Sequence, residues 1–511
     1  MPSRECVCHR IHGNSVYYYD AFVSLGGRNG DGNEEVFNQI KIADQTSETI
    51  IDSVLVADNR ADNTRKQNTY NLNYRFYGKK GQSLNLDLDY GSYKNTSQRN
   101  QPNVYYNAAQ DSVLGEVISV FDTPRDIDIY TGKLDYERNF GKGKLGIGTK
   151  YSKVSTHNKF EVADAENGAV IVNNQLSNLF DYDENVYAGF VSLSHPLGKR
   201  WTTQAGLRAE QTEAVGTLTA YQENLQEAPV NLSYLSWFPN VGVTFKVSEM
   251  NSLALNYGRR INRPDYNVLN PFNNQLSELS YQKGNPFLAP EIVNNIELGY
   301  TYKYRYNFKL AYSKTIDQIT RLIGPDENDP RANFISWANL ADQTIYSFNA
   351  SLPFQFTKKW NAFFNLSASH IDNQADYGDG AVVDVQIFTY SFYQQQTINL
   401  PNKFVAEISG YFAGPGVWGG VFKYESSWAL NLGLQRKFLN DQLNVKLSAN
   451  DIFYESGWDG FSEFDGLYSE GFGRWDSRNV NLSVSYNFGN QKLNARKRKT
   501  GLESESKRIG Q

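Results

Sequence analysis

Apolar and polar residues alternate strictly in many short stretches of this chain, and this alternation constrains the fold more than any other feature. In LNLDLDY, residues 84–90, a leucine occupies every second position, and Asn or Asp lies between the leucines. Successive side chains of a β-strand point to opposite faces, so the pattern predicts a strand with one apolar and one polar face. Similar stretches recur from about Tyr70 to Phe488. The sequence therefore predicts an all-β fold.

Very short polar turns join these stretches in pairs. The turns stand at residues 77–82, 140–144, 196–200, 247–251, 303–306, 357–360, 400–403 and 439–442. Short links of this kind between alternating runs predict β-hairpins, and eight hairpins plus a final strand give about 17 strands. The connections between hairpins are longer, on the order of 15 to 35 residues. In an antiparallel up-and-down arrangement, all short turns then lie at one end and all long loops at the other.

A transmembrane β-barrel explains this arrangement better than a soluble β-sandwich, whose strands also alternate. In a barrel the apolar face meets lipid, the polar face lines a wet lumen, and closure leaves no free strand edge. We therefore expect Leu84, Leu86 and Leu88 to contact acyl chains, and Asp87 and Asp89 to face water inside. Aromatic residues near strand ends fit the two membrane interfaces. They are Tyr90, Tyr136, Tyr151, Trp201, Tyr257, Trp360, Tyr486 and Phe488.

Composition excludes several other classes of protein. The chain has 511 residues, but no run approaches the roughly 18 consecutive apolar residues of a membrane helix. The net charge of -5, without a basic domain, argues against nucleic acid as a partner. Cys6 and Cys8 are the only cysteines, so no disulfide framework is expected. The first residues lack the apolar core of a secretory signal peptide.

Two blocks of sequence resemble a known family. They are GRRINRPDYNVLNPF at 258–272 and YQKGNPFLAPEIVNNIELGYTYK at 281–303, followed later by SVSYNFGN and the RKRKTGLESESKR tail. Together they resemble the outer-membrane β-barrel family of TonB-dependent receptors, from about Asn59 to the C-terminus. The residues that match the family's motif are expected to have a structural role. They are Arg259, Arg260, Asn262, Arg263, Pro264, Asn270, Pro271, Phe272, Gly284, Asn285 and Pro286.

The resemblance implies a receptor of the cell outer membrane, in which a plug domain fills a 22-strand barrel and contact with TonB drives uptake. It implies binding of scarce nutrients such as iron chelates, glycans or peptides, contact with outer-membrane lipid and lipopolysaccharide, and no enzymatic activity. A plug and the first four or five strands are not recognisable before Tyr70. We therefore expect an N-terminally truncated receptor with about 17 to 18 strands, in which TonB is reached only through a plug missing from this chain.

The chain divides into three expected parts. Residues 1–58 form an atypical N-terminal segment with the remnant of an early barrel loop, 59–489 form the barrel, and 490–511 form a basic and mixed-charge tail. The tail is expected to be solvated, with contact to an anionic envelope component as the alternative. Pro264 and Pro271 are expected to end strand pairing at an outer loop, because proline lacks the ladder donor. The motif arginines are expected to pair with acidic groups in the upper lumen rather than with lipopolysaccharide phosphates.

No motif predicts catalysis, a cofactor or a metal site. GKGKLGIG at 141–148 satisfies the G-x-G-x-x-G pattern, but a strand follows it, so a hairpin turn is the better interpretation. The acidic loops at 323–334 and 376–380 are interpreted as solvated turns rather than calcium sites. The N-terminal cysteines and histidines match no zinc-site spacing. They are Cys6, Cys8, His9 and His12.

Two loops near the C-terminus combine aromatic and acidic residues. Exposed aromatic rings beside carboxylates are suited to stack on sugar rings and accept their hydroxyls, and the alternative is that the rings pack the loops on themselves. The candidate ligand-binding residues are Trp418, Trp458, Phe461, Phe464, Tyr468, Phe472 and Trp475. The leading hypothesis is a TonB-dependent uptake receptor. The alternatives are a passive outer-membrane porin or surface adhesin, and a soluble β-rich carbohydrate-binding protein.

Overall fold

The computed structural model describes residues 4–8, 18–44, 47–166, 169–326, 332–376, 382–418, 422–464, 467–488 and 501–509. The strands of the first half are β1 (Arg4–Cys8), β2 (Tyr18–Asp44), β3 (Ser47–Tyr77), β4 (Ser83–Asn107), β5 (Val113–Asp122), β6 (Arg125–Phe140), β7 (Gly143–Glu166), β8 (Ala169–Val172), β9 (Asn178–Leu197), β10 (Trp201–Ala220), β11 (Val230–Lys246) and β12 (Ser252–Asn262). Those of the second half are β13 (Asn273–Ser277), β14 (Ser280–Lys283), β15 (Glu291–Tyr302), β16 (Tyr306–Pro325), β17 (Asn333–Thr357), β18 (Trp360–Asp376), β19 (Val382–Asn399), β20 (Phe404–Ala413), β21 (Gly416–Trp418), β22 (Phe422–Tyr424), β23 (Ser427–Phe438), β24 (Leu443–Asn450), β25 (Gly457–Phe464), β26 (Leu467–Arg474) and β27 (Asn479–Tyr486). The helical turns are η1 (Lys79–Gly81), η2 (Glu223–Leu225), η3 (Pro401–Lys403), α1 (Glu503–Ser506) and η4 (Lys507–Ile509). Among these described residues, no helix reaches the length and apolar character that crossing a membrane requires.

All eight predicted short turns join neighbouring strands of one sheet. They connect β3 to β4, β6 to β7, β9 to β10, β11 to β12, β15 to β16, β17 to β18, β19 to β20 and β23 to β24. The turn between β6 and β7 contains Gly141 with φ 59°, a conformation that favours glycine. The G-x-G-x-x-G pattern therefore belongs to a hairpin, as the sequence predicts.

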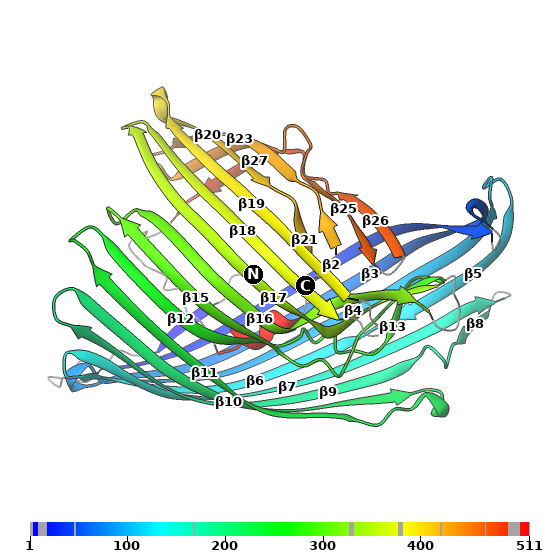
Figure 1. The fold of residues 1–511 in the computed structure, drawn as a ribbon, viewed down its shortest axis with the longest axis horizontal. Helices are drawn as coiled ribbons and strands as arrows, with labels where there is room; N and C mark the ends of the chain where they lie inside the picture. The colour runs from blue at the N-terminus through cyan, green and yellow to red at the C-terminus, as the bar shows by residue number, and fades with distance from the viewer. Residues whose placement is uncertain are drawn as a thin grey trace.

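The paired strands form one large sheet that curves around an enclosed space (Figure 1). Within the described residues, 18 antiparallel strands follow one another as neighbours from β2 to β27, and the short β1 pairs with the start of β2. This confirms the all-β, up-and-down barrel fold. In the described part of the chain, no pairing joins β27 to β1 or β2, so the sheet has two free edges.

The sheet begins earlier in the chain than the readable alternation does. β2 and β3 are 27 and 31 residues long and pair from Tyr18 to Tyr77. Residues 26–35, GGRNGDGNEE, have no apolar face, so their extended form follows from pairing with β3 and not from local pattern. The predicted boundary between residues 58 and 59 falls inside β3, and residues 18–58 are part of the sheet apart from the undescribed pair 45–46.

The outer face of the sheet is apolar next to the short turns, and a row of tyrosines ends this apolar belt. Leu88 is 44% exposed on this face. Tyr70, Tyr90 and Tyr130 lie opposite one another on β3, β4 and β6, with ring centroids 5.8 and 4.8 Å apart. An aromatic row at the edge of an apolar belt marks a membrane interface. A spanning strand needs only about 9 to 11 residues, so these longer strands extend beyond the membrane toward the long loops.

The inner face differs from the wet lumen that the sequence predicts. Asp87 and Asp89 point inward, as the alternation requires, but they are only 8% and 5% exposed. Asp89 accepts hydrogen bonds from the side chains of Asn71 and Thr131 and from the backbone N–H of Gly501. The prediction that both carboxylates face water is therefore wrong, because neighbouring side chains and the C-terminal segment cover them.

The described part of the C-terminal tail lies inside the barrel. Residues 501–509 contain α1 and η4, and Leu502, Glu505 and Arg508 are buried. Figure 1 shows this segment in red within the space that the sheet encloses. For these residues the predicted solvated position is wrong, because they pack against the inner wall.

Candidate functional site

The sequence predicts an outer loop after β12. In the structure, the motif segment between β12 and β15 turns into the barrel instead. It begins at Arg263, passes through the small hairpin of β13 and β14, and ends at Glu291, the first residue of β15. Pro264 follows the last paired residues of β12, and Pro271 precedes β13, so both prolines stand where strand pairing stops. The segment thereby brings its apolar residues to the inner wall.

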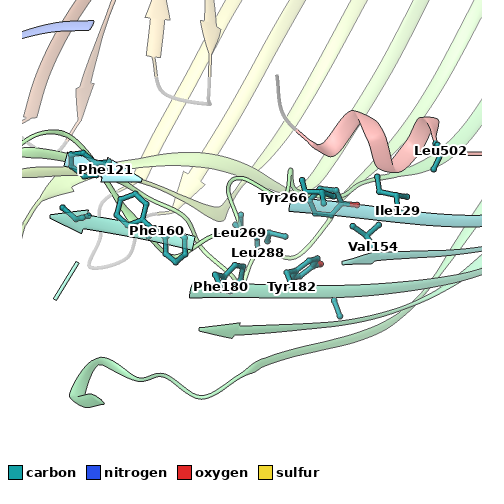
Figure 2. Packing of buried hydrophobic residues seen from close by; sticks show 14 residues of the cluster. Phe121, Ile129, Val154, Phe160, Phe180, Tyr182, Tyr266, Leu269, Leu288 and Leu502 are labelled. Carbon is teal, nitrogen blue, oxygen red and sulfur yellow. The ribbon is translucent and has the colours of Figure 1, made fainter. Parts of the chain in front are cut away.

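Apolar side chains of the motif segment pack against inward-facing side chains of the wall (Figure 2). The ring centroid of Phe272 lies 5.1 Å from that of Phe160 and 6.3 Å from that of Phe180, and all three rings are buried. The segment also contributes Tyr266, Leu269 and Leu288, and the wall contributes Phe121, Ile127, Ile129, Val154, Val162, Tyr182 and Ala214. Close packing of this kind makes this part of the lumen a hydrophobic core.

Close backbone contacts hold the motif segment in its shape. The backbone N–H of Asn285 donates to the carbonyl of Val268 at 2.7 Å, and its side-chain amide donates to the carbonyl of Trp337 at 2.9 Å. A Cβ atom at position 284 would lie 2.0 Å from the carbonyl oxygen of Asn270. Only glycine permits such a close approach, so the shape of the motif segment requires glycine at position 284.

The motif arginines differ in their surroundings. Arg263 Nη2 donates to Glu210 Oε2 at 2.7 Å and to Thr212 Oγ1 at 2.9 Å inside the lumen. Arg259 is partly buried, and its Nε has no hydrogen-bond partner among the described residues, whereas Arg260 is exposed. An acidic partner in the lumen is therefore shown for Arg263. The remaining motif residues lie at the end of β12 or within the motif segment: Asn262, Asn270 and Pro286.

A cavity of 640 Å³ lies at the long-loop end of the lumen, against the motif segment. Its wall residues Asn95 and Arg99 stand beyond Tyr90 on β4, on the side away from the short turn. Part of the lining is aromatic and comes from Phe121, Phe160, Phe272 and Trp337. The motif segment closes another side with Asp265, Asn267, Val268, Asn270 and Gly284.

Positive charge exceeds negative charge in the lining of this cavity. The cationic residues are Arg99, Arg125, Lys159 and Arg321, and the anionic ones are Glu34 and Asp265. Lys159 forms ion pairs with Asp122 and Glu161. Arg99 places its guanidinium 4.1 Å from the ring centroid of Phe121, and its Nε and Nη2 atoms are buried without a hydrogen-bond partner among the described residues. Such donors fit an anionic ligand.

The pairing register of β3, β4 and β6 brings two arginines close together on the inner face. Arg65 on β3 lies opposite Asn95 on β4, and Asn95 lies opposite Arg125 on β6. The side-chain oxygens of Asn59, Asn95 and Asn270, all in the cavity lining, are buried with no partner in the described part of the chain. The cavity therefore presents unused donors and acceptors beside a surplus of arginine.

The one carboxylate that the motif segment adds to the cavity is Asp265. Burial raises the pKa of Asp265 above its ordinary value, and the nearby charge of Arg508 acts against this rise. A raised pKa means that the negative charge of Asp265 is less favoured than that of a solvated aspartate. The cavity thus becomes more positive as the pH falls.

The two aromatic loops meet in a small sheet of their own. β21 pairs with β22, β22 with β25, and β25 with β26, so the loops around residues 418 and 460 lie side by side. The guanidinium carbon of Arg321 lies 3.8 Å from the ring centroid of Trp418. Because Arg321 lines the cavity, Trp418 lies at the edge of the cavity. The Nζ atom of Lys423 lies 5.9 Å from the ring centroid of Phe461. Trp418, Trp458, Phe472 and Trp475 are exposed, while Phe464 ends β25 and Tyr468 lies in β26.

Asp451 anchors this loop sheet to the barrel, and its ionisation predicts a pH dependence. Burial alone would raise the pKa of Asp451, but hydrogen bonds from Ser477 and from the backbone N–H groups of Glu455 and Ser456 lower it below the ordinary value of 3.8. Because the pKa is lower in the folded protein, the ionised carboxylate of Asp451 stabilises the fold at pH values above 3.8. This contribution is lost as the pH falls through the folded-state pKa.

We therefore expect the amides of β25 and β26 to exchange faster as the pH falls below 3.8, after correction for intrinsic rates. Asp451→Asn should show fast exchange already at pH 7, because the charge-assisted hydrogen bonds are gone. Hydrogen exchange with mass spectrometry measures this. Asp441→Asn, an exposed residue of a short turn, is the control and should leave β25 and β26 unchanged. Equal protection in Asp451→Asn and the wild type would contradict the prediction.

The cavity arginines did not stand out in the sequence, although a pattern points to them. On β6, Leu134 and Tyr136 face outward, whereas Ile127 and Ile129 are buried on the inner face. The apolar positions therefore change from even to odd numbers at Tyr130, where the strand leaves the membrane. Past this change the inner face is the one to search for binding residues.

No metal centre stands out. Within the described ranges, no group of three or more His, Cys, Asp or Glu residues is arranged to hold a metal ion. Asp326, in the first acidic loop, accepts a hydrogen bond from the hydroxyl of Tyr281 at 2.5 Å. His9, His12, Asp329 and Asp379 lie outside the described residues.

The model of the outer membrane protein beta-barrel family matches residues 74–486. The chain belongs to this family. As a member of the outer membrane protein beta-barrel family, it is located in the cell outer membrane, which excludes the soluble carbohydrate-binding alternative. No curated protein matches the sequence.

Solved structures with the same fold are receptors and transporters. The copper transporter OprC aligns with a TM-score of 0.54 at 12% identity, over 95% of this chain and 83% of that one. The siderophore receptor PiuA from Acinetobacter baumannii aligns with a TM-score of 0.52 at 13% identity, over 95% and 80%. The hemophore receptor HasR of Serratia marcescens aligns with a TM-score of 0.51 at 13% identity, over 95% and 80%. At these identities the likeness shows the fold. The resemblance to the outer-membrane β-barrel family is confirmed by the family match.

Proposed function

We propose that this outer-membrane barrel is an uptake receptor that binds an anionic small molecule in the cavity at the long-loop end. The observation that carries the proposal is the surplus of arginine in a partly buried lining, with buried and unpaired Nε and Nη2 atoms on Arg99. Ligand carboxylates or phosphates would satisfy these donors. Phe121, Phe160 and Trp337 would contact the apolar part of the same ligand.

Metal chelates that carry negative charge are the ligand class that fits this lining best. The ferric citrate transporter FecA, a solved structure with a TM-score of 0.50 and 11% identity to this chain, supports such a class through its name and fold. The siderophore receptor PiuA supports it in the same way. In this proposal the barrel supplies the ligand site, and coupling to TonB runs through a plug domain.

Titration of the purified full chain with ferric citrate tests this proposal. We expect Arg99→Ala or Arg125→Ala to weaken binding about 10- to 100-fold, since a hydrogen bond to a charged group contributes about 1.5 to 3 kcal/mol. Arg138→Ala is the matched control, because Arg138 is an exposed arginine near the short turn of the same β6 strand as Arg125. Binding that is equally strong in all three variants would contradict an anion site in the cavity.

We also propose that the exposed aromatics of the loop sheet help to capture ligand at the entrance. Trp418 supports this role because it stacks on Arg321 of the cavity lining. The same titration applies to it: Trp418→Ala should weaken binding a few-fold, in keeping with about 0.5 to 1.5 kcal/mol for an aromatic contact. Tyr304→Ala, an exposed aromatic in a short turn at the opposite end, should have no effect.

A further inference from the structure

The buried C-terminal segment is held by a bidentate ion pair. Arg508 Nη1 and Nη2 donate to the two carboxylate oxygens of Glu184 on β9, at 2.5 and 3.1 Å. Arg508 Nε donates to the carbonyl of Pro264 at 2.9 Å, and the backbone N–H of Tyr266 donates to the carbonyl of Arg508 at 2.9 Å. Both charged side chains are almost fully buried. This geometry fixes the segment to the wall and to the motif segment together.

Further contacts fix the other end of the segment. Lys150 on β7 donates to both carboxylate oxygens of Glu505, at 2.8 and 3.0 Å, and to the hydroxyl of Ser504. The backbone N–H of Gly501 donates to Asp89 on β4 at 2.9 Å. Leu502 is 4% exposed and belongs to the apolar cluster of the lumen (Figure 2). From Gly501 to Arg508, the wall thus offers Asp89, an apolar cluster, Lys150 and Glu184, in the order that the segment needs.

We propose that the inner wall formed by β4, β6, β7 and β9 is a docking site for a short peptide, and that residues 501–509 of this chain are its resident ligand. The site would select a peptide with an acidic residue that meets Lys150 and, three positions later, an arginine that meets Glu184. The segment acts as a latch, because it holds Pro264 and Tyr266 on one side of the motif segment. This inference is independent of the ligand proposed for the cavity.

The latch is connected to the cavity through a few residues of the motif segment. Pro264 and Tyr266 contact Arg508, while Asp265, Val268 and Asn270 line the cavity. The two functions therefore share one stretch of backbone. Release of the C-terminal segment removes the hydrogen bonds on one side of that stretch and loosens the side that faces the cavity.

A disulfide tests the docking position in the full chain. A Cβ atom at Gly501 would lie 2.6 Å from Thr131 Oγ1 and 2.5 Å from Asp89 Oδ2, so Thr131→Cys with Gly501→Cys is made together with Asp89→Ala, which clears the space and leaves the two sulfurs in bonding reach. Cys6→Ser and Cys8→Ser remove the native thiols. We expect the cross-link to form in outer-membrane vesicles, as mass spectrometry of the linked peptides would show. Tyr130→Cys with Gly501→Cys is the control, because Tyr130 faces outward on the same strand. A yield no higher than in this control would overturn the docking site.

Hydrogen exchange of residues 264–272 tests the latch. We expect Arg508→Gln to raise their exchange rate about tenfold or more, while Lys507→Gln, which removes the same charge from the exposed neighbouring residue, leaves it unchanged. If Arg508→Gln fails to fold, the cross-linked protein supplies the comparison, with slower exchange in the oxidised than in the reduced form. An exchange rate of residues 264–272 that stays the same in Arg508→Gln and in the oxidised cross-linked protein would overturn the latch. These measurements involve no cavity ligand. A negative result would therefore not bear on the proposed uptake function, which the ferric citrate titration tests separately.

Discussion

Replacing Gly284 with alanine is expected to destabilise the protein by about 3 kcal/mol, the upper end of the usual range for overpacking. The new Cβ atom would meet the carbonyl oxygen of Asn270 at 2.0 Å and that of Val268 at 2.8 Å. Both obstacles are backbone atoms, so no side chain can rotate away. The motif segment would have to move, and the hydrogen bond from Asn285 to Val268 would be lost with it.

Urea unfolding in lipid vesicles measures this effect, and hydrogen exchange locates it in residues 264–288. Gly258→Ala is the matched control, because a Cβ atom at Gly258 meets nothing within 4 Å although this glycine lies on the strand that leads into the motif segment. Equal stability of Gly284→Ala and Gly258→Ala would show that the motif segment does not pack as described.

Leu255→Arg is expected to destabilise the barrel by about 2 to 4 kcal/mol, the cost of a cationic side chain facing the middle of the membrane. Leu255 is an exposed residue of β12, between the short turn that precedes this strand and Tyr257. Its partners in register, Val243 on β11 and Leu298 on β15, extend the same apolar belt. A guanidinium placed there would contact acyl chains instead of water.

The neighbouring substitution Asn256→Arg supplies the control, because the side chain of Asn256 lies on the inner face, near that of Gln204. Unfolding free energies in vesicles should therefore fall far more for Leu255→Arg than for Asn256→Arg. The reverse order would mean that the apolar belt is not the lipid-facing surface.

The wall of the barrel could be predicted from the sequence because its cause is local. Alternation fixes which side chains share a face, and each short turn fixes the register of two strands. Leu88 and Tyr90 occupy the positions that this reasoning requires. Residues 26–35 lack alternation, so the sequence pattern predicts no strand there, and pairing with β3 determines their structure.

The contents of the lumen could not be predicted in this way. Arg508 and Glu184 are 324 positions apart, and no local pattern indicates that they form an ion pair. Arg263 and Glu210 are separated by 53 positions and pose the same difficulty. Gly284 and Phe272 stand out in the sequence as motif residues, but the direction of the motif segment, into the barrel, depends on apolar partners from five different strands.

The latch comes after the wall in the chain, so the last part of the chain to be made completes the interior. Residues 501–509 follow β27, so every strand of the wall is made before Leu502 and Arg508 exist. Without them, Glu184 would be a carboxylate on the inner wall with no partner from Arg508, and the cluster around Tyr266 would lack Leu502. A chain that lacks residues 501–509 would therefore keep an unfinished interior, with one uncompensated charge and one gap in its apolar packing.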